Sequence, residues 1–148
     1  MSEPDWRTKA VEAFPEMTEV FEEVENPMGL WLTLADAFER AYDEPRDESL
    51  IQRIYAFADW CLVQKREKDA DQDLPSCVAV CFYEHIPTRK ASREDMPRWF
   101  TWQEVAGMRS IFGYHLADDE FDQLRRLFAD SDESSRKRKR RQPRKKAA

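Results

Sequence analysis

The sequence predicts an all-α fold, and three observations support that prediction. The chain of 148 residues has only 3 glycines, few for the turns of an all-β sandwich or barrel. Its one uninterrupted apolar run, from Cys77 to Tyr83, has no second run to pair with, and a buried strand without a partner would leave backbone groups unsatisfied. Residues 48–68 repeat apolar side chains at three-and-four spacing. We therefore predict a single helical domain of five to seven helices.

The run from Cys77 to Tyr83 is predicted to be the centre of the core. Its Val, Phe and Tyr content would also suit a strand. The flanks favour a helix, because Pro75 suits a first turn and Ile86-Pro87 ends a helix.

The other elements follow from caps, prolines and apolar spacing. Asn26-Pro27 marks one helix start, and Thr101 with Glu104 forms a capping box at another. Residues 88–98 form a long polar interruption, and Gly113 is expected to end a helix in the left-handed conformation. Besides the central helix, helices are predicted over residues 5–14, 15–25, 27–42, 48–68, 101–113 and 117–129.

The net charge of −6 conceals two regions of opposite sign. Residues 136–148 carry nine Lys and Arg and no acid, so the rest has 15 basic residues against 30 acidic ones, a net of −15. We predict an acidic helical domain over residues 1–130 and a disordered basic tail over residues 131–148, where apolar content is too low to offset chain entropy.

The cysteines and the N-terminus indicate the compartment. Three cysteines without metal-type spacing suggest packed thiols in a reducing environment. The first residues are acidic where a signal peptide would be basic, and no apolar run approaches the ~18 residues of a membrane span. We expect a soluble, cytoplasmic protein without a membrane contact.

No catalytic or metal-binding set can be assembled from the sequence. The Ser-His-Asp order, the Gly-rich phosphate loop and the His-Glu-x-x-His pattern are all missing. Cys77 and His85 are eight residues apart, about 12 Å along a helix, so they cannot share one ion with Cys81. We predict no enzyme activity, no cofactor, and no catalytic, cofactor-binding or metal-binding residues.

Two groups of residues are candidates for binding a protein partner. An acidic segment would attract a basic partner, and tryptophans are favoured interface anchors. The alternatives are a solvated helix face for the acids and a sealed core edge for the tryptophans. The candidates are Glu16, Glu19, Glu22, Glu23, Glu25, Trp99 and Trp102.

The basic tail suggests a second function, contact with nucleic acid. It has no aromatic residues for base stacking, so binding would be nonspecific and sensitive to salt. Contact of the tail with its own acidic domain is the alternative. The candidate residues are Arg136, Lys137, Arg138, Lys139, Arg140, Arg141, Arg144, Lys145 and Lys146.

Two short motifs carry a resemblance. Pro15-Glu16-Met17 and Val78-x-Val80-x-Phe82-x-Glu84-His85-Ile86 resemble a family of small, all-helical bacterial domains of unknown function, over about residues 11–128. The resemblance implies no activity or cofactor, and some acidic helical domains of this kind resemble immunity proteins. The leading hypothesis is a non-enzymatic protein-binding domain, in one form an immunity-type inhibitor of a basic partner. The alternative is a nucleic-acid-associated protein that binds through its tail.

Overall fold

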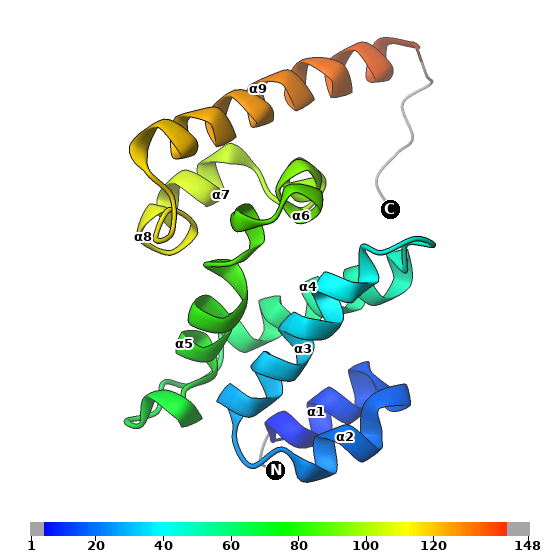
Figure 1. Ribbon diagram of the computed structural model, residues 1–148, viewed down its shortest axis with the longest axis vertical. Coiled ribbons are helices and arrows are strands. Elements are labelled where there is room, and N and C mark those ends of the chain that lie inside the picture. Colours follow the sequence, from blue (N-terminus) through cyan, green and yellow to red (C-terminus); the bar gives the residue numbers. More distant parts are fainter. Residues whose placement is uncertain (1–4, 142–148) are drawn as a thin grey trace. The chain divides into compact units, whose positions relative to one another are not determined.

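The computed structural model describes residues 5–141, with side chains as far as Ser131. Every regular element in that range is helical and no strand occurs there, so the predicted all-α class is confirmed (Figure 1). These residues form nine α-helices where we predicted five to seven. The two additional ones are α6 (Lys90–Asp95) and α8 (Arg109–Phe112).

The chain divides into two compact units, residues 1–85 and 86–148, which we call the first and second units. The division falls directly before Ile86-Pro87, where the sequence predicts the end of the central helix. The predicted separation of a tail beyond residue 130 stays a prediction. None of the helices in the described range has the length and apolar composition to cross a membrane.

Two of the first three helices of the first unit, α1 (Trp6–Ala13) and α3 (Pro27–Ala41), begin at side-chain caps. Asp5 accepts a hydrogen bond from the Thr8 amide at the start of α1, and Asn26 accepts one from the Gly29 amide at the start of α3. Both bonds satisfy amides that the helix itself cannot pair. Between these helices, the predicted helix 15–25 is a 3₁₀ turn, Pro15–Met17, followed by α2 (Thr18–Glu23).

Helix α4 (Glu48–Leu62) is shorter than predicted. The prediction that it reaches Lys68 is wrong. The polar residues after Val63 have no apolar face to bury, and the Gln64 side chain instead donates to the Trp60 carbonyl at 2.9 Å, which helps to end the helix.

The central run is helical, as predicted, but not uniformly α-helical. Helix α5 (Leu74–Val78) continues without a break into a π-helical turn, Ala79–Tyr83, in which the Glu84 amide bonds to the Ala79 carbonyl at 3.0 Å. Three successive residues at its end, Cys81, Phe82 and Tyr83, are buried. Val80 is 50% exposed, so the expectation that the whole run is buried is wrong at that position.

The core of the first unit is built from stacked aromatic rings. The fully buried Trp31 ring lies 5.7 Å from Phe57 of α4 and 5.2 Å from Phe82 of the π-helical turn, nearly parallel to both. Phe38 meets Phe82 edge-on at 4.7 Å. These contacts connect α3, α4 and the central helix, and aromatic pairs of this kind contribute about 0.5–1.5 kcal/mol beyond their buried area.

In the second unit, the predicted capping box is confirmed at the start of α7 (Trp102–Gly107): the Glu104 amide donates to Thr101 Oγ1 and the Thr101 amide to Glu104 Oε1. Residues 88–98, the long polar interruption of the sequence, form α6 and a 3₁₀ turn, Met96–Arg98. The buried Ser92 hydroxyl donates to the Ile86 carbonyl at 2.6 Å, a local contact that the polar composition did not reveal.

Gly113 ends α8, but not in the left-handed conformation that we predicted. Its φ is −92°, which any residue can adopt. A glycine is needed here because there is no room for a side chain. A Cβ at this position would lie 2.8 Å from the Arg109 carbonyl oxygen and 3.2 Å from the Phe121 ring.

The last helix, α9 (Asp118–Arg141), buries Phe121, Leu124 and Phe128 as predicted. Its predicted end at Ala129 is wrong, because the helical backbone continues to Arg141. The predicted disorder of residues 131–148 is therefore not confirmed, and the part from residue 142 onward lies outside the described residues.

The two glycines of this region make a matched pair for testing the role of space. We expect Gly113→Ala to lower the free energy of unfolding by about 1–3 kcal/mol, because the new methyl group overlaps backbone. Gly107→Ala meets no atom within 4 Å and is expected to be neutral or stabilising by up to about 1 kcal/mol. Chemical denaturation measures both; equal effects would contradict the explanation by close approach.

Candidate functional site

Four of the predicted partner-binding residues form one exposed set on or just after α2. These are Glu19, Glu22, Glu23 and Glu25, which we call the α2 carboxylates. In the part of the chain with described side chains, no ion pair or hydrogen bond reaches any of them. The sequence explains this, since it has no Lys or Arg between Lys9 and Arg40.

Glu16 differs from the α2 carboxylates because its side chain is already engaged. Both of its carboxylate oxygens accept hydrogen bonds from Arg53 of α4, at 2.9 and 2.6 Å, and this hydrogen bonding lowers the pKa of Glu16. Arg53 also donates to the Ala13 carbonyl at 3.1 Å. Glu16 therefore connects the turn before α2 to α4, although such a half-exposed pair contributes only about 0.2–1 kcal/mol.

The two candidate tryptophans lie in the second unit and both are half-buried. The Trp99 indole N–H donates to Asp95 at 3.0 Å, and the Arg98 guanidinium lies 4.8 Å from the ring centre. Trp102 packs against two rings of α9, Phe121 at 5.2 Å and Phe128 at 5.6 Å. Trp102 therefore fits the alternative interpretation of the two tryptophans, in which the ring covers an edge of the core.

The nine candidate nucleic-acid contacts fall in two groups. Residues 136–141 continue the helical backbone of α9. The other three, Arg144, Lys145 and Lys146, lie outside the described residues.

The three cysteines are buried and form no disulfide bond, as the apolar patterns predicted. Burial raises the pKa of Cys61 and of Cys77 to about 12 and also raises that of Cys81. A thiol with such a pKa is protonated, and therefore a poor nucleophile, at neutral pH. Cys77 Sγ lies 3.3 Å from the Ala70 carbonyl and donates to it, so this thiol holds the segment before α5.

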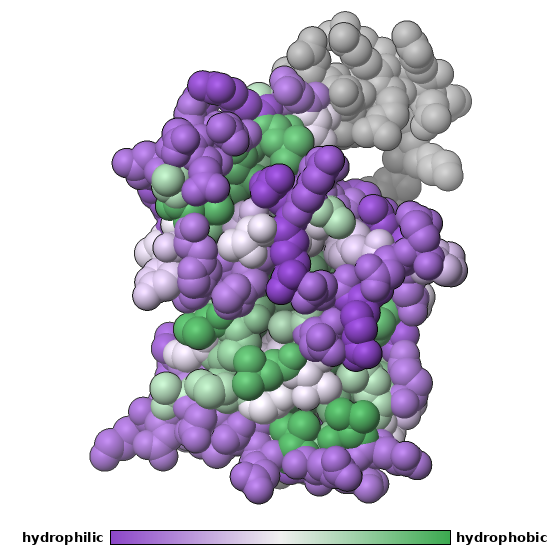
Figure 2. All heavy atoms as spheres, viewed as in Figure 1, coloured by the Kyte–Doolittle hydropathy of each residue, from purple (hydrophilic) through white to green (hydrophobic). Residues whose placement is uncertain are grey.

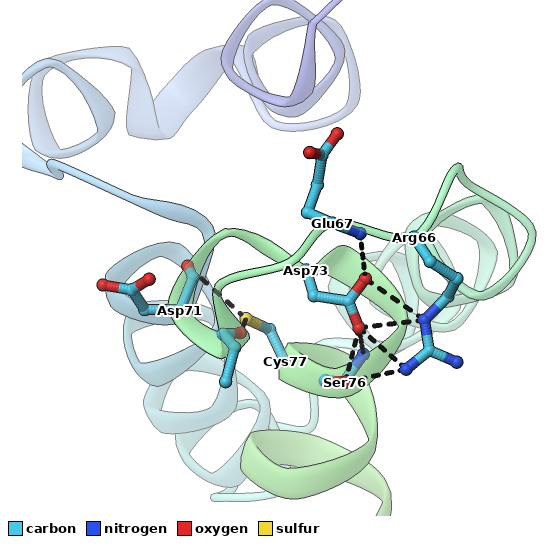
Figure 3. Close-up of polar contacts among 7 residues, drawn as sticks. Arg66, Glu67, Asp71, Asp73, Ser76 and Cys77 are labelled. Atoms are coloured by element: carbon cyan, nitrogen blue, oxygen red, sulfur yellow. Dashed lines mark hydrogen bonds and ion pairs between the residues drawn. The ribbon is translucent and has the colours of Figure 1, made fainter.

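A buried carboxylate that the sequence analysis missed organises the segment between α4 and α5. Asp73 is 2% exposed and caps α5 (Figure 3). It accepts hydrogen bonds from the Ser76 amide and hydroxyl, from the Glu67 amide at 2.7 Å and from Arg66 Nε at 3.0 Å. Burial alone would raise the pKa of Asp73, but these donors lower it from 3.8 to about 2. The pattern Asp-Leu-Pro-Ser, a cap before a first-turn proline, was the available signal.

The first unit also exposes some apolar surface. Val20 of α2 is 45% exposed and Leu32 of α3 is 59% exposed. Figure 2 shows apolar side chains gathered on the face of the first unit over α3 and α5, with hydrophilic ones beside them. Apolar side chains beside charges are typical of surfaces that contact other proteins.

The first unit is therefore an acidic helical module whose α2 carboxylates have no counter-charge among the described side chains. The chain belongs to a family of domains of unknown function, DUF7674, whose match covers residues 7–101. The matched region contains every helix of the first unit apart from the first residue of α1, and it ends before Trp102. No curated protein and no solved structure matches the chain.

The family membership confirms the resemblance to domains of unknown function, over a shorter stretch than expected. The α2 carboxylates and Trp99 lie inside the matched residues, whereas Trp102 and the tail lie outside them.

The contribution of Asp73 to stability can be tested through its pH dependence. We expect Asp73→Ala to lower the free energy of unfolding by about 2 kcal/mol at neutral pH, because a cap and a charged acceptor are lost. The folded-state pKa lies below the unfolded value, so this contribution is present above pH 3.8 and disappears as the pH falls toward about 2. Denaturation of both proteins across acidic pH measures the difference.

The exposed Asp69, in the same segment, provides the control, and Asp69→Ala is expected to change stability by less than about 0.5 kcal/mol. A difference between wild type and Asp73→Ala that persists at the lowest pH would contradict the role assigned to the ionised carboxylate.

Proposed function

We propose that the chain is a non-enzymatic domain that binds a basic protein through α2, and that its specific form is an immunity-type inhibitor of a basic effector. One observation carries the proposal: the α2 carboxylates are exposed and have no partner among the described side chains. Elsewhere in the first unit, arginines do pair with carboxylates, as Arg53 does with Glu16 and Arg66 with Asp73.

The charge of the whole first unit supports the same partner. Residues 1–85 carry 20 Asp and Glu against 8 Lys and Arg, a net charge of −12. Such a field accelerates the encounter with a cationic protein and selects against anionic ones. Val20, between Glu19 and Glu22 in the sequence, adds apolar contact area to the same helix.

The double variant Glu22→Gln/Glu23→Gln tests the contact surface. We expect capture of a basic partner by the full-length protein to weaken by a factor of about three to ten, since two exposed charge pairs are lost. The experiment is a pulldown at low salt, identification of the retained protein by mass spectrometry, and titration of that protein against wild type and variant.

The matched control is Asp43→Asn/Glu44→Gln, which removes the same charge from an exposed turn of the same unit. Equal loss of affinity in both variants would show that only net charge matters. Retention of acidic proteins alone would overturn the proposal.

A second candidate function is nonspecific nucleic-acid binding through the tail. It is favoured by the continuation of α9 to Arg141, which adds six of the nine tail cations to one helix. The −12 first unit opposes it by repelling the same polyanion, so we expect weak binding at physiological salt.

The salt dependence of DNA binding separates the tail from the rest of the chain. If the tail contacts phosphates, the triple variant Arg144→Gln/Lys145→Gln/Lys146→Gln should reduce the slope of log affinity against log salt by about 0.7–0.9 for each lost contact. A fluorescent duplex titrated across a salt series gives both slopes. A control with Lys65, Lys68 and Lys90 changed to Gln should keep the wild-type slope; equal slopes for all three proteins would exclude phosphate contacts by Arg144, Lys145 and Lys146.

A further inference from the structure

The first unit contains an open groove of about 470 Å³ that none of the predicted site residues lines. Its walls come from the start of α1, the end of α4 and the segment between α4 and α5. A volume of this size accommodates a side chain or a small ligand.

The groove combines two indole rings with three carboxylates. Trp6 and Trp60 line it, together with Asp5, Glu67 and Asp69. The Glu67 and Asp69 side chains have no partner among the described residues, and both residues are exposed. Carboxylates beside aromatic faces are the usual surroundings of a bound organic cation.

The other charges near the groove are compatible with a cationic ligand. Lys65 and Lys68 also line it, but both are exposed, and their long stems allow the ammonium groups to extend into water. The C-terminal end of the 15-residue α4 adds the partial negative charge of its last carbonyls.

Both indole rings already have a cation beside them. The Arg7 guanidinium carbon lies 4.6 Å from the centre of the Trp6 ring, and Lys9 Nζ lies 5.7 Å from the centre of the Trp60 ring. These distances are within the range of cation–π attraction. The rings of the groove are therefore placed where they interact with positive charge.

We propose that the groove binds an arginine side chain of the basic partner, an inference that rests on the proposed function. A planar guanidinium stacks on an indole face and donates paired hydrogen bonds to a carboxylate of Glu67 or Asp69. The ammonium of lysine offers neither the planar face nor the paired donors. The groove provides a specific anchor, while the α2 carboxylates provide long-range attraction.

The experiment uses N-acetyl-arginine amide as the probe and full-length ¹⁵N-labelled protein. The chain has 5 tryptophans, each with its own indole N–H signal, which single Trp→Phe variants assign. We expect saturable shifts of the Trp6 and Trp60 signals and none at Trp31, Trp99 or Trp102. N-acetyl-lysine amide should shift the same two signals less, and N-acetyl-glutamate amide should shift neither.

A pair of charge-matched variants decides whether the groove itself binds the probe. Glu67→Gln/Asp69→Asn should weaken binding of the probe by about tenfold, and the charge-matched Asp43→Asn/Glu44→Gln should leave its affinity unchanged. Equal weakening in both variants, equal response to the arginine and lysine probes, or no saturable shift at Trp6 and Trp60 would each overturn the groove assignment. Loss of the basic partner in the α2 variant, with no probe response at the two indoles, would refute the groove and leave the proposed function standing.

Discussion

The first unit depends on the position of one ring, the Trp31 indole between Phe57 and Phe82. This stacking requires three aromatic side chains, each from a different helical segment, to meet at one point in the core. An unbroken α-helix would turn one of Cys81, Phe82 and Tyr83 toward solvent, because successive residues are rotated by about 100°. The wider π-helical turn changes that rotation and keeps all three buried. The departure from α-helical geometry therefore serves the packing of Trp31.

The same core fixes the segment between α4 and α5, and with it the groove. Trp60 stacks on Phe57 at 5.7 Å, so the indole that lines the groove is continuous with the Trp31 stack. On the other side, Asp73 holds Arg66 and the Glu67 amide against the start of α5. A segment with almost no apolar side chains is thus ordered by one buried carboxylate together with the Cys77 thiol, which explains why exposed residues there can hold defined positions.

The sequence predicted the structural features that depend on neighbouring residues and missed those that depend on residues far apart in the chain. The helix starts at Asn26 and Thr101 are local, because the cap and its amide lie within three residues. The end of α4 after Leu62 depends on burial. The end of α8 at Gly113 was predicted, but the reason for the glycine, its close approach to Phe121, lies outside the local pattern. The exposure of the α2 carboxylates followed from composition. The pairing of Glu16 with Arg53, 37 residues away, and the groove of Trp6 and Trp60 did not.

The placement of the arginines explains why the first unit's own arginines do not pair with the α2 carboxylates. Each of the five arginines of the first unit has another contact: Arg7 with the Phe21 carbonyl, Arg40 with Asp36, Arg46 with Glu48, Arg53 with Glu16 and Arg66 with Asp73. These contacts join helices, caps or turns, and none involves an α2 carboxylate. Repulsion along α2 costs only a few tenths of a kcal/mol for a pair such as Glu19 and Glu23. The fold tolerates that cost easily, and the carboxylates stay available to a cation from another molecule.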